Sequence, residues 1–352
     1  MSRRDIGTDD PRVHVRPGKG SRPRTKKRPS FAHAVPGMVI AVDRGRFTVA
    51  ISRDHTVQAV KARALGRKGV IVGDMVGLEG DTSGTPDTLA RIVTLEDRQT
   101  VLRRSFDESA VGAREKFIVA NATQMLIVVA ARNPEPRRGM IDRAIVTALD
   151  AKVTPLLAVT KTDLNPAAEL IADYEAIGIK VFALNGCLYE LGTEGITSTG
   201  TGSQTEPLDP GAQQLAPLLQ QLTGEITVLL GHSGVGKSTL VNALVPGANR
   251  ATGTVNEVTG KGRHTSTSAV ALPVAAQGWL IDTPGVRSFG LAHVDAAGLL
   301  RGFSELYAIA QDCPRGCTHV ADSPDCLLDE HPEVALRRES FRSLLTEIPS
   351  TY

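Results

Sequence analysis

The chain has 352 residues, of which 41% are hydrophobic and 22% are charged, and its formal net charge is +2. This length allows two or three domains with a sizeable core, and the composition is that of an ordinary globular protein. No uncharged apolar stretch reaches the roughly 18 residues of a membrane span, and no apolar segment follows the basic N-terminus as in a secretory signal. We therefore expect a cytoplasmic protein without a membrane partner.

The first 30 residues form a basic segment. They contain ten Lys or Arg against three Asp, a net charge of +7 that leaves −5 for the rest of the chain. Because it lacks apolar periodicity, residues 1–30 are predicted to be a disordered arm. Such an arm can contact nucleic-acid phosphates and release counterions, or it can serve only as a solubilising tail.

Residues 31–97 are predicted to be an all-β unit. Short β-branched runs are separated by Gly, Asp or Pro, at 37–42, 46–51, 57–61, 69–72, 75–78 and 89–93. About five strands in this length predict a small barrel of the oligonucleotide-binding (OB) kind. Scattered basic positions suit RNA, but Phe47 is nearly the only aromatic residue, so base stacking is not predicted. A barrel that serves only for packing is the alternative.

Residues 98–291 show the alternation of an α/β domain. The apolar run 124–131 is typical of a strand buried on both faces of a parallel sheet. Further strands are predicted at 153–159, 179–184, 225–230 and 278–281, and helices at 141–151 and 166–177. Residues 186–211 are rich in Gly, Thr and Ser and are predicted to be a long flexible loop. Residues 292–352 are predicted to be a mostly helical region around a Cys/His cluster.

The sequence GHSGVGKST at residues 231–239 follows one of the predicted strands and fits the pattern G-x-x-x-x-G-K-[ST]. In such a phosphate loop the backbone N–H groups turn inward around the phosphates of a nucleotide. Lys237 would reach the β- and γ-phosphates, and the Ser238 hydroxyl would bind Mg²⁺. The predicted phosphate-binding residues are Gly231, His232, Ser233, Gly234, Val235, Gly236, Lys237, Ser238 and Thr239.

Two further motifs follow predicted strands. The sequence DTPG at residues 282–285 would supply a carboxylate, Asp282, near Mg²⁺ and a backbone N–H, that of Gly285, near the γ-phosphate. The TKTD segment (residues 160–163) resembles the N-K-x-D element with which GTPases read guanine. There the aspartate, here Asp163, accepts hydrogen bonds from guanine N1–H and the 2-amino group, which adenine lacks. By itself this tetrapeptide could equally be a helix N-cap.

In the remainder of the TKTD segment, the stem of Lys161 would cover the base, and Thr162 completes the predicted GTP-binding set. Thr160 stands where the usual element has Asn, which weakens one contact on the N7/O6 side of the base. The segment comes about 70 residues before the phosphate loop, whereas GTPases carry it last. This order is that of a circularly permuted GTPase, a cheap rearrangement where the original termini lie close together.

With these motifs the chain from about residue 36 resembles the family of ribosome small subunit-dependent GTPase A (RsgA, also YjeQ). The resemblance implies an OB-fold, a permuted P-loop GTPase and a zinc-binding C-terminal region. It also implies a monomer that hydrolyses GTP to GDP and phosphate with turnover stimulated by the small (30S) ribosomal subunit. The implied role is late maturation of that subunit, in contact with its 16S rRNA.

The same resemblance makes residues 260–267 a switch. Thr265 or Thr267 would complete the Mg²⁺ coordination in the GTP state. Val286 stands where other GTPases place the glutamine that orients water, and an apolar side chain cannot do so. By resemblance His264 is the candidate catalytic residue that positions water, and a solvent-facing histidine is the alternative.

The Cys/His cluster consists of Cys313, Cys317, His319 and Cys326. Three thiolates and one imidazole suit a closed, structural, tetrahedral site for one Zn²⁺ per chain, with buried free thiols as the alternative. The family usually has C-x4-C-x-H-x5-C, whereas here the first gap is one residue shorter and the last one longer. Cys187 lies outside the cluster and is interpreted as incidental.

A second departure from the family lies at residues 183–186. The family usually has a Ser-Ala turn that touches guanine, and the sequence here is ALNG, which leaves that contact open.

Two other classes of function remain open on the motifs alone. Thr160 leaves some room for a P-loop ATPase or kinase, although no substrate-binding lid of a kinase is visible in the sequence. The second alternative is an RNA-binding protein with a degenerate nucleotide site.

Overall fold

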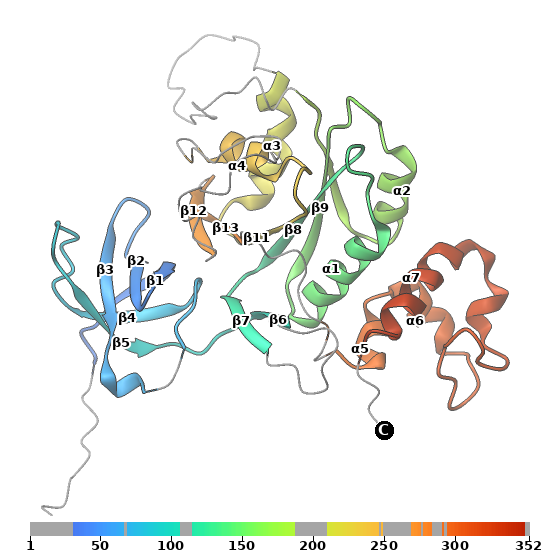
Figure 1. The fold of residues 1–352 in the computed structure, drawn as a ribbon, viewed down its shortest axis with the longest axis horizontal. Helices are drawn as coiled ribbons and strands as arrows, with labels where there is room; N and C mark the ends of the chain where they lie inside the picture. Colours follow the sequence, from blue (N-terminus) through green and yellow to red (C-terminus); the bar gives the residue numbers. More distant parts are fainter. Residues whose placement is uncertain are drawn as a thin grey trace, which may run out of the picture. The chain divides into compact units, whose positions relative to one another are not determined.

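The computed structural model describes residues 31–66, 69–105, 115–186, 210–245, 248, 269–275, 277–283, 291 and 294–348 (Figure 1). The basic arm and most of the predicted loop 186–211, with Cys187, lie outside these ranges. Within them, no helix combines the length and apolar character needed to cross a membrane.

The N-terminal strands close into a barrel. They are β1 (Val35–Asp43), β2 (Arg46–Ala50), β3 (Thr56–Lys61), β4 (Met75–Gly80) and β5 (Ala90–Leu95). Their order is β1-β2-β3-β5-β4, and β1 also pairs with β4. Alternating side chains such as Val39, Leu78 and Ile92 fill the interior and are fully buried. The five-stranded barrel predicted from the sequence is confirmed.

The strand predicted at residues 69–72 does not form. Only Val72 makes an isolated bridge, to Val119. The Ile71 N–H instead donates to the Asp74 carboxylate at 2.8 Å, and Gly73 turns the chain with a φ of +90°. Asp74 is itself buried and paired with Arg98 at 2.6 Å. The prediction was wrong because the buried carboxylate takes the hydrogen bond that a ladder would need.

A two-stranded hairpin follows the barrel, formed by β6 (Val101–Ser105) and β7 (Glu115–Ala120). The sequence analysis did not predict it, since both strands carry charged residues among few apolar ones. Leu102 and Val119 are buried in the core of the α/β domain, which ties the hairpin to that domain.

The α/β domain is built on a mostly parallel sheet. Its strands are β8 (Gln124–Ala130), β9 (Thr154–Thr160), β10 (Lys180–Ala183), β11 (Ile226–Leu230), β12 (Val270–Val274) and β13 (Gly278–Asp282). In space the order is β10-β9-β8-β11-β13-β12, and only β12 runs antiparallel to its neighbour β13. Strand β12 was not predicted.

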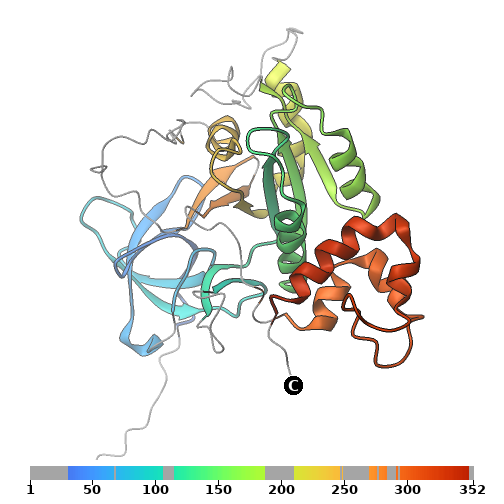
Figure 2. The same cartoon turned by 45° about the vertical axis from the view of Figure 1, so that its right-hand side comes forward.

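Two pairs of helices cover the two faces of this sheet (Figures 1 and 2). Helices α1 (Arg138–Asp150) and α2 (Ala168–Ala176) pack on one face, and α3 (Pro210–Leu222) and α4 (Lys237–Leu244) on the other. Successive residues of β8 point to opposite faces, so Ile127 contacts the first pair's core and Val128 the second's. This explains the continuous apolar run of β8.

The C-terminal region is helical around a second core. It contains α5 (Ala296–Arg301), α6 (Ser304–Ala310), two short 3₁₀ turns, η4 (Leu327–Glu330) and η5 (Pro332–Val334), and α7 (Ala335–Leu345). Phe303 and Phe341 meet edge to face with centroids 5.6 Å apart. Val146 of α1 belongs to the same cluster, so the C-terminal core continues onto the α/β domain.

A buried charged network fastens α7 to α1. The Asp142 side chain is only 1% exposed and forms an ion pair with Arg337, which also binds Glu305 at 2.6 Å. Tyr174 donates its hydroxyl to Asp142 at 2.8 Å. Burial raises the pKa of the Asp142 carboxyl, and the positive charge of Arg337 opposes that rise. Arg337 is therefore the cation that makes an ionised Asp142 tolerable inside the protein.

Replacing Arg337 with Met is expected to destabilise the protein by about 3 kcal/mol, since it leaves a buried carboxylate without its cation. The loss should grow as the pH rises, because burial raises the pKa of Asp142 and only its ionised form is penalised. Urea unfolding at several pH values measures both. The control is Arg138→Met, whose ion pair with Asp173 has side chains 33% and 44% exposed and is worth about 1 kcal/mol or less. Equal losses in the two variants would contradict the account.

Candidate functional site

The predicted motifs meet at one edge of the sheet. Parallel strands β8, β9, β11 and β13 end there, and ligands of such sheets bind beyond the carboxyl ends of the strands. The TKTD segment follows β9, the phosphate loop (residues 231–239) follows β11, and Asp282 ends β13. The structure therefore brings together three segments that lie far apart in the sequence.

The phosphate loop depends on glycine at three positions. Gly234 and Gly236 have φ values of +82° and +87°, in the left-handed region that other residues rarely adopt. A Cβ on Gly231 would lie 2.7 Å from the Val128 carbonyl oxygen, so any side chain there would push the loop off the sheet. Helix α4 begins directly at Lys237. Its N-terminus thus faces the loop, as binding of phosphate requires.

Lys237 and Asp282 face each other across the site. The Lys237 Nζ lies 3.2 Å from a carboxylate oxygen of Asp282, and the two side chains are 17% and 9% exposed. The neighbouring Thr283 donates its hydroxyl to the Leu229 carbonyl at 3.0 Å, which fixes the end of β13 against β11. The cation predicted for phosphates and the carboxylate predicted for Mg²⁺ therefore share one small, half-enclosed space.

The TKTD segment is hydrogen-bonded to the phosphate loop. The buried Thr160 hydroxyl lies 2.6 Å from the Val235 carbonyl oxygen, and the Lys161 ammonium donates to the Gly234 carbonyl at 2.8 Å. Lys161 also contacts the Asn133 carbonyl. Helix α2 starts only at Ala168, and its first residues receive no side-chain cap. The alternative interpretation of the segment as a helix N-cap is therefore wrong.

The segment 183–186 lies beside Asp163. The Thr162 N–H donates to the Leu184 carbonyl at 3.1 Å, and a Cβ on Gly186 would lie 3.4 Å from the Asp163 carboxylate. The backbone after β10 therefore passes next to the carboxylate predicted to read guanine. Whether ALNG contacts the base stays a prediction.

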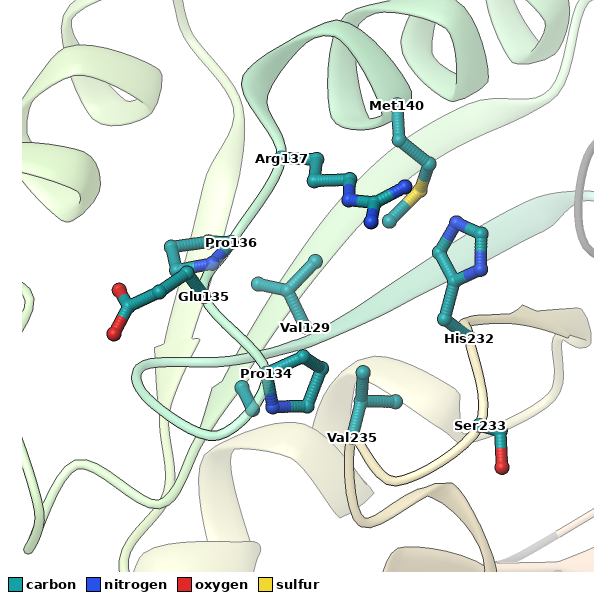
Figure 3. A pocket seen from close by; sticks show the side chains of 10 residues that line it. Val129, Pro134, Glu135, Pro136, Arg137, Met140, His232, Ser233 and Val235 are labelled. Carbon is teal, nitrogen blue, oxygen red and sulfur yellow. The ribbon is translucent and has the colours of Figure 1, made fainter.

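A pocket of about 350 Å³ flanks the phosphate loop on the side of the β8–α1 connection (Figure 3). Its lining residues are Val129, Ala130, Pro134, Glu135, Pro136, Arg137, Met140, His232, Ser233 and Val235. The set contains neither Lys237 nor Asp163 nor Asp282. The side chains of His232 and Ser233 thus face a space beside the predicted phosphate site, so their predicted part in GTP binding rests on their backbone N–H groups.

Several predicted site residues lie outside the described part of the chain. They are His264, Thr265, Thr267, Gly285, Val286 and Arg287. Their roles in the switch, in Mg²⁺ binding and in water positioning stay predictions. Ser238 and Thr239 are described and occupy the first turn of α4, half-buried.

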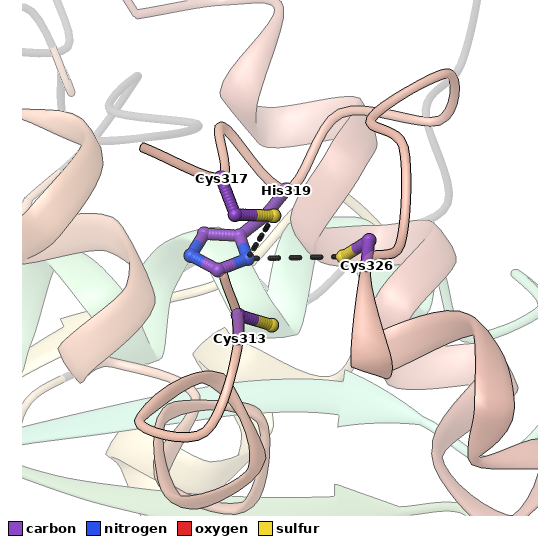
Figure 4. Close-up of side chains that lie close together, drawn as sticks. All are labelled: Cys313, Cys317, His319 and Cys326. Carbon is purple, nitrogen blue, oxygen red and sulfur yellow. Dashed lines mark hydrogen bonds between the residues drawn. The ribbon is translucent and has the colours of Figure 1, made fainter. Parts of the chain in front are cut away.

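The Cys/His cluster is assembled in the C-terminal region (Figure 4). The four ligand atoms of Cys313, Cys317, His319 and Cys326 all lie within 4.8 Å of one another. The His319 Nδ1 is 3.4 Å from the Cys317 sulfur and 3.8 Å from the Cys326 sulfur. Zinc–ligand bonds of about 2.0–2.3 Å imply similar separations in a tetrahedral site, so the residues fit Zn²⁺ despite the altered spacing.

The surroundings of the cluster hold its ligands in place. Arg342 of α7 donates to the His319 carbonyl at 3.0 Å and lies 3.9 Å from the Cys326 sulfur, while Asp329 binds its guanidinium at 2.8 Å. Burial raises the pKa of the Cys326 thiol to about 11. Burial and the nearby Arg342 both lower the pKa of His319, which keeps the imidazole neutral as a ligand must be.

Replacing Cys326 with Ser is expected to remove the bound zinc, since the buried sulfur is one of four ligands. The purified chain should contain about one zinc per molecule by elemental analysis, and the variant close to none. The control is Cys187→Ser, which changes a cysteine outside the cluster and should keep the metal. A wild-type chain that holds no zinc, and whose thermal unfolding is unchanged by added zinc, would contradict the assignment.

Sheet, phosphate loop, TKTD segment and Asp282 together define a class of protein, a P-loop GTPase whose motifs occur in circularly permuted order. The RsgA GTPase family model matches residues 95–193 and 197–292, more than half of the chain. The chain belongs to the RsgA GTPase family.

Curated relatives and solved structures agree with this assignment. A "Small ribosomal subunit biogenesis GTPase RsgA" from Pseudomonas savastanoi is 33% identical over 291 residues, covering 80% of this chain and 75% of the relative. One from Bacteroides fragilis is 31% identical over 290 residues, covering 79% and 84%. The structures of YloQ, "a circularly permuted GTPase", and of YjeQ from Thermotoga maritima are 20% and 22% identical. Both have a TM-score of 0.62; they cover 90% and 89% of this chain and are themselves covered to 96% and 97%. They bear out the fold, including the permuted order.

Sequence reasoning missed two sets of functional contacts. The bonds from Thr160 and Lys161 to the phosphate loop depend on the packing of β9 against β8 and β11, which no local pattern encodes. Arg342 has no motif of its own, because only the fold of α7 places it beside the cysteines.

Proposed function

We propose that this chain binds GTP at the edge of the sheet, hydrolyses it to GDP and phosphate, and acts in the maturation of the small ribosomal subunit. The observation that carries the proposal is the hydrogen bonding of the TKTD segment to a phosphate loop whose lysine faces Asp282 at 3.2 Å. The names of the curated relatives support the part in small-subunit biogenesis.

The proposed roles follow from the chemistry of each group. Asp163 accepts hydrogen bonds from the guanine N1–H and 2-amino group, and Lys161 covers the base. The loop N–H groups and Lys237 bind the β- and γ-phosphates. Lys237 must then exchange its contact with Asp282 for the phosphates, so nucleotide binding separates this ion pair. Gly285 would donate its N–H to the γ-phosphate.

Mg²⁺ fits the oxygen donors available here. Asp282 and Ser238 supply a carboxylate and a hydroxyl, which are ligands that Mg²⁺ prefers, and Thr265 would add a second hydroxyl. When bound, the ion neutralises charge on the β- and γ-phosphate oxygens. His264 would position the attacking water, in keeping with the apolar Val286 at the place of the usual glutamine.

The remaining parts of the proposal concern organisation. We place the boundaries at a basic arm 1–30, an OB-fold 31–97, the permuted GTPase domain 98–291 and the zinc-binding region 292–352. The barrel and the arm would contact 16S rRNA, zinc would hold the C-terminal region together, and the chain would act as a cytoplasmic monomer.

The proposal predicts that purified small subunits accelerate GTP hydrolysis and that large subunits do so much less. The stimulation should weaken steeply as salt rises, because basic contacts to rRNA release counterions. Phosphate release measured with each subunit at several salt concentrations tests both expectations. Equal hydrolysis with and without small subunits would contradict the proposed partner while leaving GTP binding intact.

A further inference from the structure

Thr160 holds a buried position between the sheet and the phosphate loop. Its hydroxyl oxygen lies 2.6 Å from the Val235 carbonyl oxygen and 3.2 Å from that of Val129, and the residue is only 4% exposed. A hydroxyl has one proton to donate. The much shorter contact takes that proton, so the donor of Thr160 is committed to the phosphate loop.

The commitment has a geometric effect on the loop. The Val235 carbonyl and the Gly236 N–H belong to one planar peptide group and point in opposite directions. Holding the carbonyl toward β9 therefore directs the Gly236 N–H to the other side, the concave side of the loop. Lys161 acts likewise on the preceding peptide group, since its bond to the Gly234 carbonyl directs the Val235 N–H.

A second consequence concerns the base. Guanine N7 and O6 are both acceptors and need a donor. The lone pairs of Thr160 cannot donate, and its single proton is already bound to Val235. Asn at this position would carry two N–H groups, enough for the loop and the base together.

We propose that Thr160 is a positioning residue for the phosphate loop and takes no part in reading the base. The TKTD segment then divides its work, because Thr160 and Lys161 align two loop peptide groups for phosphates while Asp163 alone sets the preference for guanine. This inference rests on the proposed GTP site and specifies which half of the nucleotide Thr160 serves.

The test measures binding of GDP, 7-deaza-GDP and ADP to the full chain by calorimetry. In 7-deaza-GDP a C–H replaces N7, so only a residue that donates to N7 discriminates it from GDP. The wild type is expected to bind GDP and 7-deaza-GDP within about twofold of each other. Thr160→Val removes the hydroxyl at constant shape and should weaken both by on the order of tenfold, because the buried Val235 carbonyl loses its partner. Thr160→Ser keeps the hydroxyl and should restore binding.

Thr147→Val is the matched control. Its buried hydroxyl donates to the Arg143 carbonyl within α1, remote from the loop, so nucleotide affinity should not change. Thermal unfolding of each variant shows that it is folded. A folded Thr160→Val chain that binds GDP as the wild type does would overturn the inference. So would a tenfold preference of the wild type for GDP over 7-deaza-GDP that vanishes in Thr160→Val. Failure of the proposed function looks different, since ADP would then bind the wild type as well as GDP.

Discussion

Lys237→Ala is expected to reduce GTP turnover by at least about 100-fold, because removal of one group that stabilises charge in a transition state has an effect of this size. Lys237 stands at the N-terminus of α4 with its ammonium in the space that the loop encloses. No other described lysine contacts Asp282 in an ion pair. Single-turnover hydrolysis of GTP, with the variant saturated by nucleotide, separates this effect from weaker binding.

Lys180→Ala is the matched control for Lys237. That lysine is exposed on β10, binds the Gln221 side chain at 2.7 Å and lies outside the predicted site, so turnover should remain at the wild-type level. A Lys237→Ala chain that hydrolyses GTP at the wild-type rate would contradict the assignment of the phosphate loop. A change confined to RNA binding would instead favour an RNA-binding protein with a degenerate nucleotide site.

Asp163→Asn is expected to exchange the base preference from guanine to xanthine. Asp163 is acceptor-only when ionised and matches the two donors on the guanine edge, whereas an amide has one acceptor and two donors. Xanthine keeps the N1–H but carries an oxygen in place of the 2-amino group, which suits the amide. Affinity for GDP should fall on the order of 10³-fold or more, because the 2-amino group loses its partner, and xanthosine diphosphate should bind in its place.

Asp173→Asn provides the control for this exchange. Asp173 is 44% exposed on α2, where it pairs with Arg138, so its amide should leave both affinities unchanged. Competition of the two diphosphates against labelled nucleotide measures the effect in each variant. An Asp163→Asn chain that still prefers GDP to xanthosine diphosphate would show that another group reads the base.

Most of the site could be predicted because its motifs are local. A phosphate loop needs glycines, a lysine and a hydroxyl at fixed spacing, and the strand before it, β11, is an unbroken apolar run. The order of the motifs predicted the permuted fold, because each follows a strand of one parallel sheet. The Cys/His cluster was equally local, and the altered gaps did not prevent its ligand atoms from meeting.

The elements that escaped prediction depend on tertiary contacts. Helix α3 carries Pro217 in its interior and follows a stretch rich in Gly and Ser, yet Leu215, Leu218 and Leu222 bury it against the sheet. Strand β12 contains Pro273, which an edge strand tolerates. The opposite error at residues 69–72 came from β-branched residues whose backbone is captured by the buried Asp74. In each case packing or a buried charge outweighed the local pattern.

The nucleotide site and the C-terminal region are physically connected. Helix α1 begins after the β8–α1 connection that lines the pocket beside the phosphate loop, and its Asp142 binds Arg337 of α7. Five residues further along α7, Arg342 contacts His319 of the metal cluster. A change at the loop can therefore reach the zinc region through α1 and α7, and the Arg337→Met variant removes the central link of this route.

The central claim, that this sheet edge is a guanine nucleotide site, is tested most directly by competition against labelled GDP bound to the wild-type chain. Because Asp163 accepts from two donors that adenine lacks, displacement by ADP should require a concentration at least about 10³-fold higher than displacement by unlabelled GDP. Displacement by ADP and GDP at similar concentrations would contradict the claim and favour a P-loop ATPase or kinase.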